Sequence, residues 1–283
     1  MLGQTNLNLF QAGLPQVEKK RIWSKKIIES CILEDKDLKP YLYEDSTYAL
    51  NPHLLALYNF AQTPIAGKYK SVIFDQRKGI VLSKRCSRQL VHELFKKKLL
   101  FGASLQKHIN EMLGFKYHHV ISVWQHAYFS LNGYFDQNTD WISLHQMQDY
   151  QVKGNELKFI SNSGHEFKFK NCQRHLPQRI GESITHNWIL GKIIKESFRE
   201  MGLHLHSCRR VTHGNNILHN ERFILEQRII NHDEIMLKEI MTKLQALDFE
   251  QFSKAIGNLF DLKLNQDDLR LIQAETKRDD SVY

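Results

Sequence analysis

Basic side chains between residues 71 and 115 give the strongest chemical signal in this sequence. That segment has nine lysines and arginines against three acidic residues, a net +6 within a chain whose formal net charge is +8. Long cationic side chains are the groups that neutralise phosphates along a nucleic acid. A charge excess concentrated in one segment therefore predicts a polyanionic partner.

The candidate phosphate contacts lie on and around one expected helix. Apolar residues recur at helical spacing after Ser87, which is a suitable N-cap. Cations fall on the other side of the same helical wheel, within about 80° of one another at about 100° per residue. We expect Arg85 and Arg88 to insert into a DNA groove. Phosphate contacts are expected from Lys84, Lys96, Lys97, Lys98 and Lys107.

A second cluster has the residue types of a metal site. His204, His206, Cys208 and His213 could hold Zn²⁺ by their chemistry and closeness in sequence. Structural zinc sites usually carry paired cysteines or a spaced pair of histidines on one arm, and neither is present here. We therefore expect no metal and no other cofactor.

Signatures of catalysis are absent from the sequence. It contains no GxSxG, no GxxxxGK[ST] and no GxGxxG pattern. A metal-dependent nuclease needs carboxylates that converge on the ion. Near His186 and His219, only Glu182 and Glu221 are close in sequence. We expect a protein that is not an enzyme, and a nuclease remains the third hypothesis.

Cysteine spacing and hydropathy indicate the compartment. The four cysteines lie far apart and form no CxxC pair, which is typical of reduced thiols in a chain of this length. No apolar run approaches the roughly 18 residues that a membrane-spanning helix needs. The N-terminus lacks the pattern of a secretory signal. These features predict a cytoplasmic protein with no membrane partner.

Hydrophobic periodicity predicts the elements that position the cations. Alternating residues predict one hairpin over 69–83 and a second over 156–170, the latter with one apolar and one lysine-bearing face. The segment 118–144 is β-like, and a helical pattern follows Pro177. The expected fold is α+β, an antiparallel sheet core with flanking helices plus a helical C-terminal appendage. Its regions are an N-terminal extension (1–40), the α+β domain (41–199) and the helical C-terminal region (200–283).

The order of motifs within 41–199 is similar to that of a known family. The basic helix precedes Phe101-Gly102-Ala103-Ser104, and a Trp141-Ile142-Ser143 strand, the alternating hairpin and a helix with Trp188 follow. This order resembles the competence transcription factor family (ComK-like) of Gram-positive bacteria, in which a Phe/Tyr-Gly-Ser-Ser turn precedes a Trp-Ile-Ser strand. Where that family has a Gly-Arg pair, this chain offers Lys107. The resemblance makes Phe101, Gly102, Ser104, Trp141, Ile142 and Ser143 its structural motif. From the residue types themselves, we expect Gly102 to serve a turn and Trp141 to lie in the core.

The resemblance also implies a function. It implies a transcriptional activator of competence and DNA-uptake genes that binds AT-rich promoter DNA through the minor groove. Its partners would be double-stranded DNA, further copies of the chain and an adaptor of a Clp protease, at the nucleoid. The residues by themselves support a basic patch on a folded scaffold. The alternative is an interaction protein of the same fold that lacks specific DNA recognition.

Overall fold

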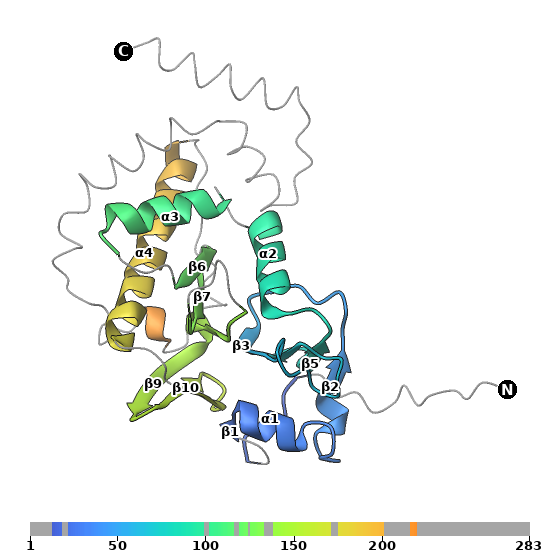
Figure 1. The fold of residues 1–283 in the computed structure, drawn as a ribbon. Coiled ribbons are helices and arrows are strands. Elements are labelled where there is room, and N and C mark those ends of the chain that lie inside the picture. The colour runs from blue at the N-terminus through green and yellow to red at the C-terminus, as the bar shows by residue number, and fades with distance from the viewer. Residues whose placement is uncertain are drawn as a thin grey trace, which may run out of the picture.

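Two β-sheets and the helices around them make up the described part of the chain (Figure 1). The computed structural model describes residues 13–18, 22–98, 102–115, 119–123, 125–132, 138–170, 175–200 and 216–219. In chain order the strands and α-helices are β1 (Ile22–Trp23), α1 (Lys25–Cys31), β2 (Leu42–Glu44), β3 (Leu54–Asn59), β4 (Ser71–Asp75), β5 (Gly79–Ser83), α2 (Ser87–Lys98), α3 (Gly102–Met112), β6 (Val120–Val123), β7 (His126–Ser130), β8 (Trp141–Ser143), β9 (Met147–Lys153), β10 (Glu156–Ser161), β11 (Glu166–Lys170) and α4 (Leu176–Glu200). Short 3₁₀ turns are η1 (Lys39–Tyr41), η2 (Leu144–Gln146) and η3 (Ile217–His219).

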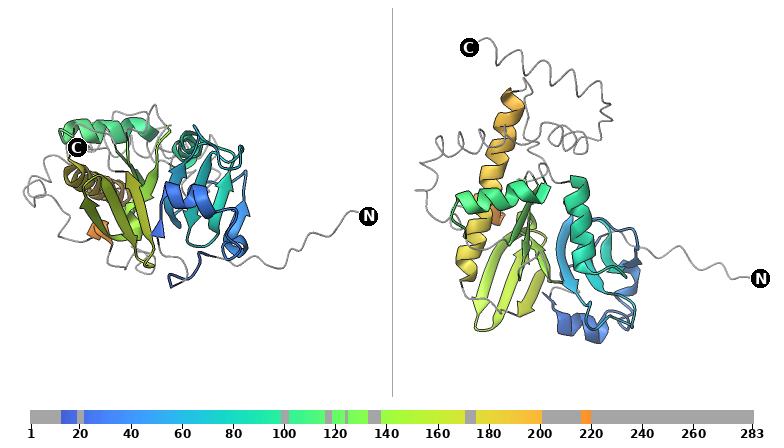
Figure 2. Two further views of the ribbon diagram at one scale, coloured as in Figure 1. Left: turned by 60° about the horizontal axis from the view of Figure 1, so that its bottom comes forward. Right: turned by 45° about the horizontal axis from the view of Figure 1, so that its top comes forward.

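The strands form a seven-stranded and a four-stranded sheet. The larger sheet has the order β2-β5-β4-β3-β8-β7-β6, and the smaller one the order β1-β11-β10-β9. Most neighbours are antiparallel, but β2 pairs with β5, and β1 with β11, in parallel. Two views show the early strands, blue to teal, beside the later green and yellow ones (Figure 2). Pairing between β3 and β8 joins these two groups into one sheet.

The larger core lies between the two sheets. Alternation along the strands turns Phe74 of β4 and Ile142 of β8 toward Phe159 and Phe167 of the smaller sheet. Trp23 packs into the same cluster, with its ring centroid 4.7 Å from that of Phe74. Strands β4 and β5 are buried at every position, as is usual for strands that are covered on both faces.

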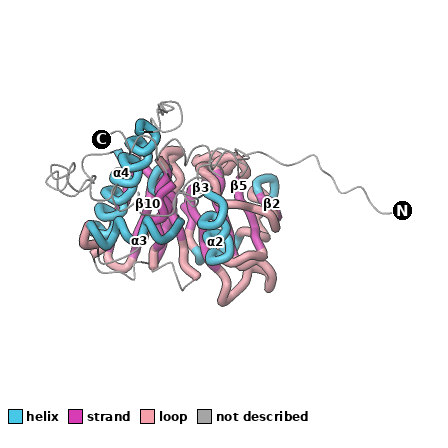
Figure 3. The backbone as a smooth tube through the Cα atoms, turned by 90° about the horizontal axis from the view of Figure 1, so that it is seen from above, coloured by secondary structure: helices cyan, strands magenta, loops and turns pink. Residues whose placement is uncertain are grey.

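A second core covers the opposite face of the seven-stranded sheet. Leu90, Val91 and Leu94 of α2 pack over strand residues that include Ile73 and Trp141. Trp141 is 2% exposed, which confirms the expectation that it belongs to the core. Seen from above, α2 and α3 lie along the same side of the strands, with α4 beside α3 (Figure 3).

The fold confirms the α+β class and both expected hairpins. The two hairpins are β4–β5 and β10–β11, with antiparallel registers. Residues before the expected boundary at 41 belong to the larger core, since Trp23 of β1 pairs with Phe167 of β11 and is buried. Ile217 and Leu218, which lie beyond the expected boundary at 200, also join the larger core. In the C-terminal region (200–283), where helices are expected, only Glu200 and residues 216–219 belong to the described part of the chain.

A side chain of α3 covers the outer edge of β6. Gln106 is fully buried, and its amide Nε2 donates to the carbonyl of Ser122 at 2.7 Å. The backbone N–H of Ser122 donates in return to Gln106 Oε1 at 3.0 Å. His186 of α4 lies 3.0 Å from Ser122 Oγ through Nδ1 and 3.2 Å from the Gln106 carbonyl through Nε2. These contacts fasten α3 and α4 to the last strand.

Candidate nucleic-acid interface

Basic residues gather at the end of the β4–β5 hairpin that lies opposite its turn. There β3 ends at Asn59, β4 begins beside it at Ser71, and Ser71 pairs with Ser83 of β5. The backbone N–H of Lys70 donates to the carbonyl of Ser83 at 2.9 Å, so Lys70 lies beside the start of the connection to α2. We define the basic rim as Lys25, Lys68, Lys70, Lys84, Arg85 and Arg88.

Glu44 of β2 holds two of the rim lysines. Lys84 Nζ lies 3.0 Å from its Oε1, and Lys68 Nζ lies 3.4 Å from its Oε2. The hydroxyl of Tyr69 donates to the same Oε2 at 2.6 Å. The hydrogen bonds from Tyr69 and Lys84 lower the pKa of Glu44 to about 2. The carboxylate therefore stays ionised at neutral pH, and its contacts do not form a switch in the physiological range.

Arg85 is turned toward the protein. Its guanidinium forms an ion pair with Glu93 at 2.9 Å and donates to the carbonyls of Tyr48 and Gln89. Its side chain is only 21% exposed. These contacts fix the start of α2, so insertion of Arg85 into a DNA groove would first have to break them.

Arg88 is the exposed arginine of the rim. It lies in the first turn of α2, one position after Ser87, where the helix begins one residue earlier than a Ser87 N-cap would place it. Gln89 Oε1 accepts from the backbone N–H of Cys86, as in half of a capping box. The backbone N–H of Arg88 donates to Asn138 Oδ1 at 3.3 Å, and the residue is exposed.

Lys25 connects α1 to the same rim. Its Nζ lies 2.9 Å from Asp140 Oδ1, which also accepts from the backbone N–H of Asn59 at 2.7 Å. Burial raises the pKa of Asp140, while Lys25 opposes that shift. Across the described rim, cations outnumber the carboxylates that contact them, which are Glu44, Glu93 and Asp140.

The structure does not bring every expected phosphate contact to the rim. Lys107 lies on α3, which is fastened to β6, and four strands separate β6 from β5. Its Nζ lies 3.6 Å from Glu111 on the same helix. The backbone of α2 continues through its last lysines, whose side chains lie outside the described residues: Lys96, Lys97 and Lys98.

The residues of the family motif lie mainly in the scaffold. Trp141, Ile142 and Ser143 form β8 and are all buried. Gly102 begins helix α3, so it does not serve the turn expected from the sequence. Ser104 is in the first turns of α3, with its side chain outside the described part, and Phe101 also lies outside it.

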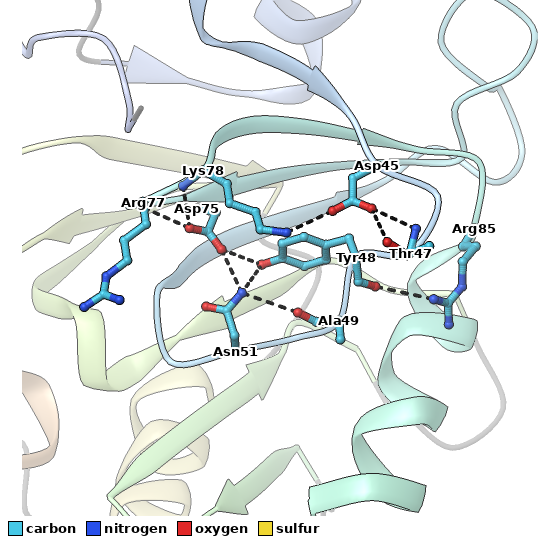
Figure 4. A network of polar contacts seen from close by, with 9 residues as sticks. All are labelled: Asp45, Thr47, Tyr48, Ala49, Asn51, Asp75, Arg77, Lys78 and Arg85. Carbon is cyan, nitrogen blue, oxygen red and sulfur yellow. Dashed lines mark hydrogen bonds and ion pairs between the residues drawn. The ribbon is translucent and has the colours of Figure 1, made fainter. Parts of the chain in front are cut away.

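The turn end of the same hairpin holds a closed polar network (Figure 4). Asp75 is 1% exposed and accepts from the Tyr48 hydroxyl at 2.9 Å and from Asn51 Nδ2 at 2.8 Å. The backbone N–H groups of Arg77 and Lys78 donate to its other oxygen, both at 2.9 Å. Sequence periodicity gives no sign of this network, because Tyr48 and Asn51 reach Asp75 from a segment that crosses the sheet.

Gly79 allows the chain to turn tightly after this network. Its φ is +93°, a left-handed conformation that glycine adopts at little cost. An added Cβ would lie 2.6 Å from the carbonyl oxygen of Gly13 and 2.7 Å from that of Tyr41. The close approach of two backbone segments thus requires glycine here.

A buried histidine lies near this end. The backbone N–H of Ala127 donates to Nδ1 of His145 at 3.2 Å, and the carbonyl of Pro52 lies 3.1 Å from its Nε2. A neutral imidazole can make both contacts, because Nε2–H donates to the Pro52 carbonyl while Nδ1 accepts from Ala127. Burial lowers the pKa of His145 to about 3, with His126 adding to the shift.

The lysine-bearing face of β10–β11 is neutralised within the sheet. Lys158 lies 3.3 Å from Glu166, and Lys168 lies 2.9 Å from Glu156. The two lysines face each other across the strands, and each has a carboxylate on the neighbouring strand. This face confirms the alternation expected from the sequence, but it offers less uncompensated charge than the basic rim.

The described residues contain neither a metal-binding cluster nor a membrane-spanning helix. Among the described residues, no group of three or more His, Cys, Asp or Glu could hold a metal ion. The cluster His204, His206, Cys208 and His213 lies outside them. No helix in the described ranges combines the length and the apolar character needed to cross a bilayer.

The chain matches no protein-family model, no curated protein and no solved structure. Its likeness to the competence transcription factor family thus depends on the order of the motifs quoted above.

Proposed function

We propose that this chain is a DNA-binding transcriptional regulator that contacts phosphates through the basic rim. The observation that carries the proposal is a group of cations near the ends of β3, β4 and β5, of which Lys68, Lys70, Lys84 and Arg88 are exposed. Lys70 and Arg88 are exposed, and within the described residues their side chains form no ion pair. Phosphate contacts made from rigid strand ends would fix the protein's orientation on a duplex.

The resemblance to the competence family supplies the finer parts of the proposal. The chain acts as an activator of DNA-uptake genes and recognises AT-rich promoter DNA at the nucleoid. Arginines enter the narrow minor groove of AT-rich DNA because its negative potential is enhanced there. Of the two candidates for this role, Arg88 is the more exposed. Further copies of the chain and an adaptor of a Clp protease are the other proposed partners.

Equilibrium binding to duplexes tests the proposal. AT-rich and GC-rich duplexes of equal length are titrated with the protein at several salt concentrations. If about five phosphates are neutralised, log K falls against log salt with a slope of about −4.5. Affinity is expected to be higher for the AT-rich duplex. Absence of binding at low salt would contradict the proposal and favour the interaction protein.

A pair of double variants locates the surface. Lys70→Gln with Arg88→Gln removes two rim cations, and it is expected to lower affinity about tenfold or more and reduce the slope by about 2. The matched control, Lys153→Gln with Lys170→Gln, removes two exposed lysines of the four-stranded sheet. Equal losses from both pairs would show that net charge, rather than the rim, determines binding.

A further inference from the structure

Three donors converge on one carboxylate at the basic rim. Lys84 Nζ contacts Oε1 of Glu44 at 3.0 Å. Lys68 Nζ at 3.4 Å and the Tyr69 hydroxyl at 2.6 Å contact Oε2. Two ammonium groups and a hydroxyl around two oxygens of one anion also suit a phosphate diester, which presents two non-bridging oxygens with a single negative charge.

The scaffold fixes the Tyr69 ring and the backbone positions of the two lysines independently of the carboxylate. The ring of Tyr69 is 6% exposed and belongs to the larger core, so its hydroxyl has a defined place at the surface. Tyr69 forms an isolated bridge with Ile65, and Lys68 Nζ lies 4.5 Å from the centroid of the Tyr69 ring. Lys84 directly follows β5. The three donors therefore form an anion-binding cradle, defined here as Lys68, Tyr69 and Lys84.

Glu44 reaches the cradle through long-range pairing. It ends β2, which is hydrogen-bonded in parallel to β5 and places Glu44 opposite Leu82. The carboxylate is well exposed at 41%, so it closes the cradle from the solvent side rather than from within the core. A side chain in that position can leave without disturbing the packing beneath it.

We propose that Glu44 is an internal competitor for phosphate, whose carboxylate occupies the cradle until a nucleic-acid phosphate displaces it. This inference depends on the proposed function, because it assigns a regulator of affinity to the same rim. After displacement, the carboxylate stays near the phosphate and repels it. Lys68 and Lys84 thus contribute less to DNA binding than Lys70 and Arg88. The affinity of the rim for DNA is therefore lower than its number of cations would predict.

Substitution of Glu44 by glutamine tests the competition. E44Q keeps the side-chain length and removes the charge, while the control E34Q removes an exposed carboxylate in the loop after α1. E44Q is expected to raise duplex affinity about tenfold and to steepen the salt slope by about 1 to 2. E34Q is expected to change affinity less than about twofold. Equal gains from the two variants would overturn the inference.

Double variants show whether the gain comes from the cradle. Lys68→Ala and Tyr69→Phe are each introduced with and without E44Q. Each is expected to lower duplex affinity by a smaller factor in the parent, where Glu44 competes for the donors, than in E44Q, where it should remove most of the gain. Additive effects in both backgrounds would contradict a shared site.

Inorganic pyrophosphate separates this inference from the proposed function. The melting temperature of E44Q is expected to rise with pyrophosphate, while the parent and E34Q change less, because a ligand that binds the native state stabilises it. A rise confined to E44Q without duplex binding by any variant would retain the cradle and reject DNA as the ligand. Duplex binding by the parent, with no gain in E44Q for DNA or pyrophosphate, would reject the cradle alone.

Discussion

The β4–β5 hairpin has charged groups at both ends, but their surroundings differ. At the turn end, Asp75 is buried and takes all its donors from within the chain. At the other end, Lys70 and Arg88 are exposed beside an exposed Glu44. Lys78, at the turn, contacts Asp45 at 2.9 Å and lies over the ring of Tyr48.

This difference shows how one run of cations serves two purposes. Lys78 and Lys84 are six positions apart, yet the first pairs with a carboxylate that is 8% exposed and the second with one that is 41% exposed. A nearly buried partner makes the ion pair part of the scaffold, since breaking it would leave an uncompensated charge. An exposed partner contributes little to folding and leaves the cation exchangeable. We therefore expect changes at the turn end to alter stability, and changes at the rim to alter binding.

The largest effect is expected from Asp75→Ala. The substitution leaves the Tyr48 hydroxyl and the backbone N–H groups of Arg77 and Lys78 without their acceptor, while Asn51 Nδ2 keeps its contacts with the Tyr48 hydroxyl and the Ala49 carbonyl. Each unsatisfied buried donor costs about 1–3 kcal/mol, so the free energy of unfolding should fall by about 3–5 kcal/mol in denaturant titrations. The control Asp37→Ala removes an exposed carboxylate and should leave the midpoint unchanged. A folded Asp75→Ala variant with the parent's stability but weakened DNA binding would contradict the assignment of the turn end to stability and of the rim to binding.

At pH 5, a smaller and pH-dependent effect of about 2 kcal/mol is expected at His145. Its pKa is lowered in the folded state, so below the unfolded value of about 6.5 the unfolded chain takes up a proton that the folded chain does not. The stability should therefore be full above pH 6.5 and fall by up to about 1.4 kcal/mol per pH unit as the pH drops toward 3. The free energy of unfolding is measured across this pH range. Its fall with decreasing pH should disappear in His145→Gln and remain in the control His92→Gln, which changes an exposed position on α2. The same pH slope in both variants would exclude His145 as its source.

The smallest effect on stability is expected from Arg88→Gln. The backbone contact to Asn138 remains, and the lost guanidinium faces solvent, so the free energy of unfolding should stay within about 0.5 kcal/mol of the parent. Thermal or chemical unfolding provides the measurement. A loss above about 1 kcal/mol would show that the rim belongs to the scaffold, and the contrast between the two ends would no longer hold.

Local patterns in the sequence were sufficient for the hairpins and for the apolar face of α2. Alternation in 156–170 and helical spacing at Leu90, Val91 and Leu94 report burial directly, because each has the period of its element. Strand β1 could not be found in this way, since two residues are too few to show a period. Its place depends on pairing with β11, more than 140 residues later.

Tertiary contacts decide which cations are exposed at the rim, and no local sequence pattern reports those contacts. Arg85 lies on the cationic side of a helical wheel, but the helix begins after it, and its guanidinium turns back to Glu93. Glu44 comes near Lys84 only because β2 joins the sheet in parallel beside β5. The charge count therefore identifies a basic segment in the sequence, whereas the division of its cations between scaffold and surface requires the tertiary structure.

The amide of Gln106 has a consequence for how copies of this chain meet. A sheet's last strand offers free N–H and C=O groups that a strand of another molecule can pair with, and this is a common route to aggregation. At Ser122 both groups are already taken by a side chain that imitates a neighbouring peptide. Helix α3 thus protects the edge of β6 from strand addition. Loss of this helix would expose an edge at which strands of other copies could add without limit. Helix α3 therefore protects against aggregation as well as packing on the sheet.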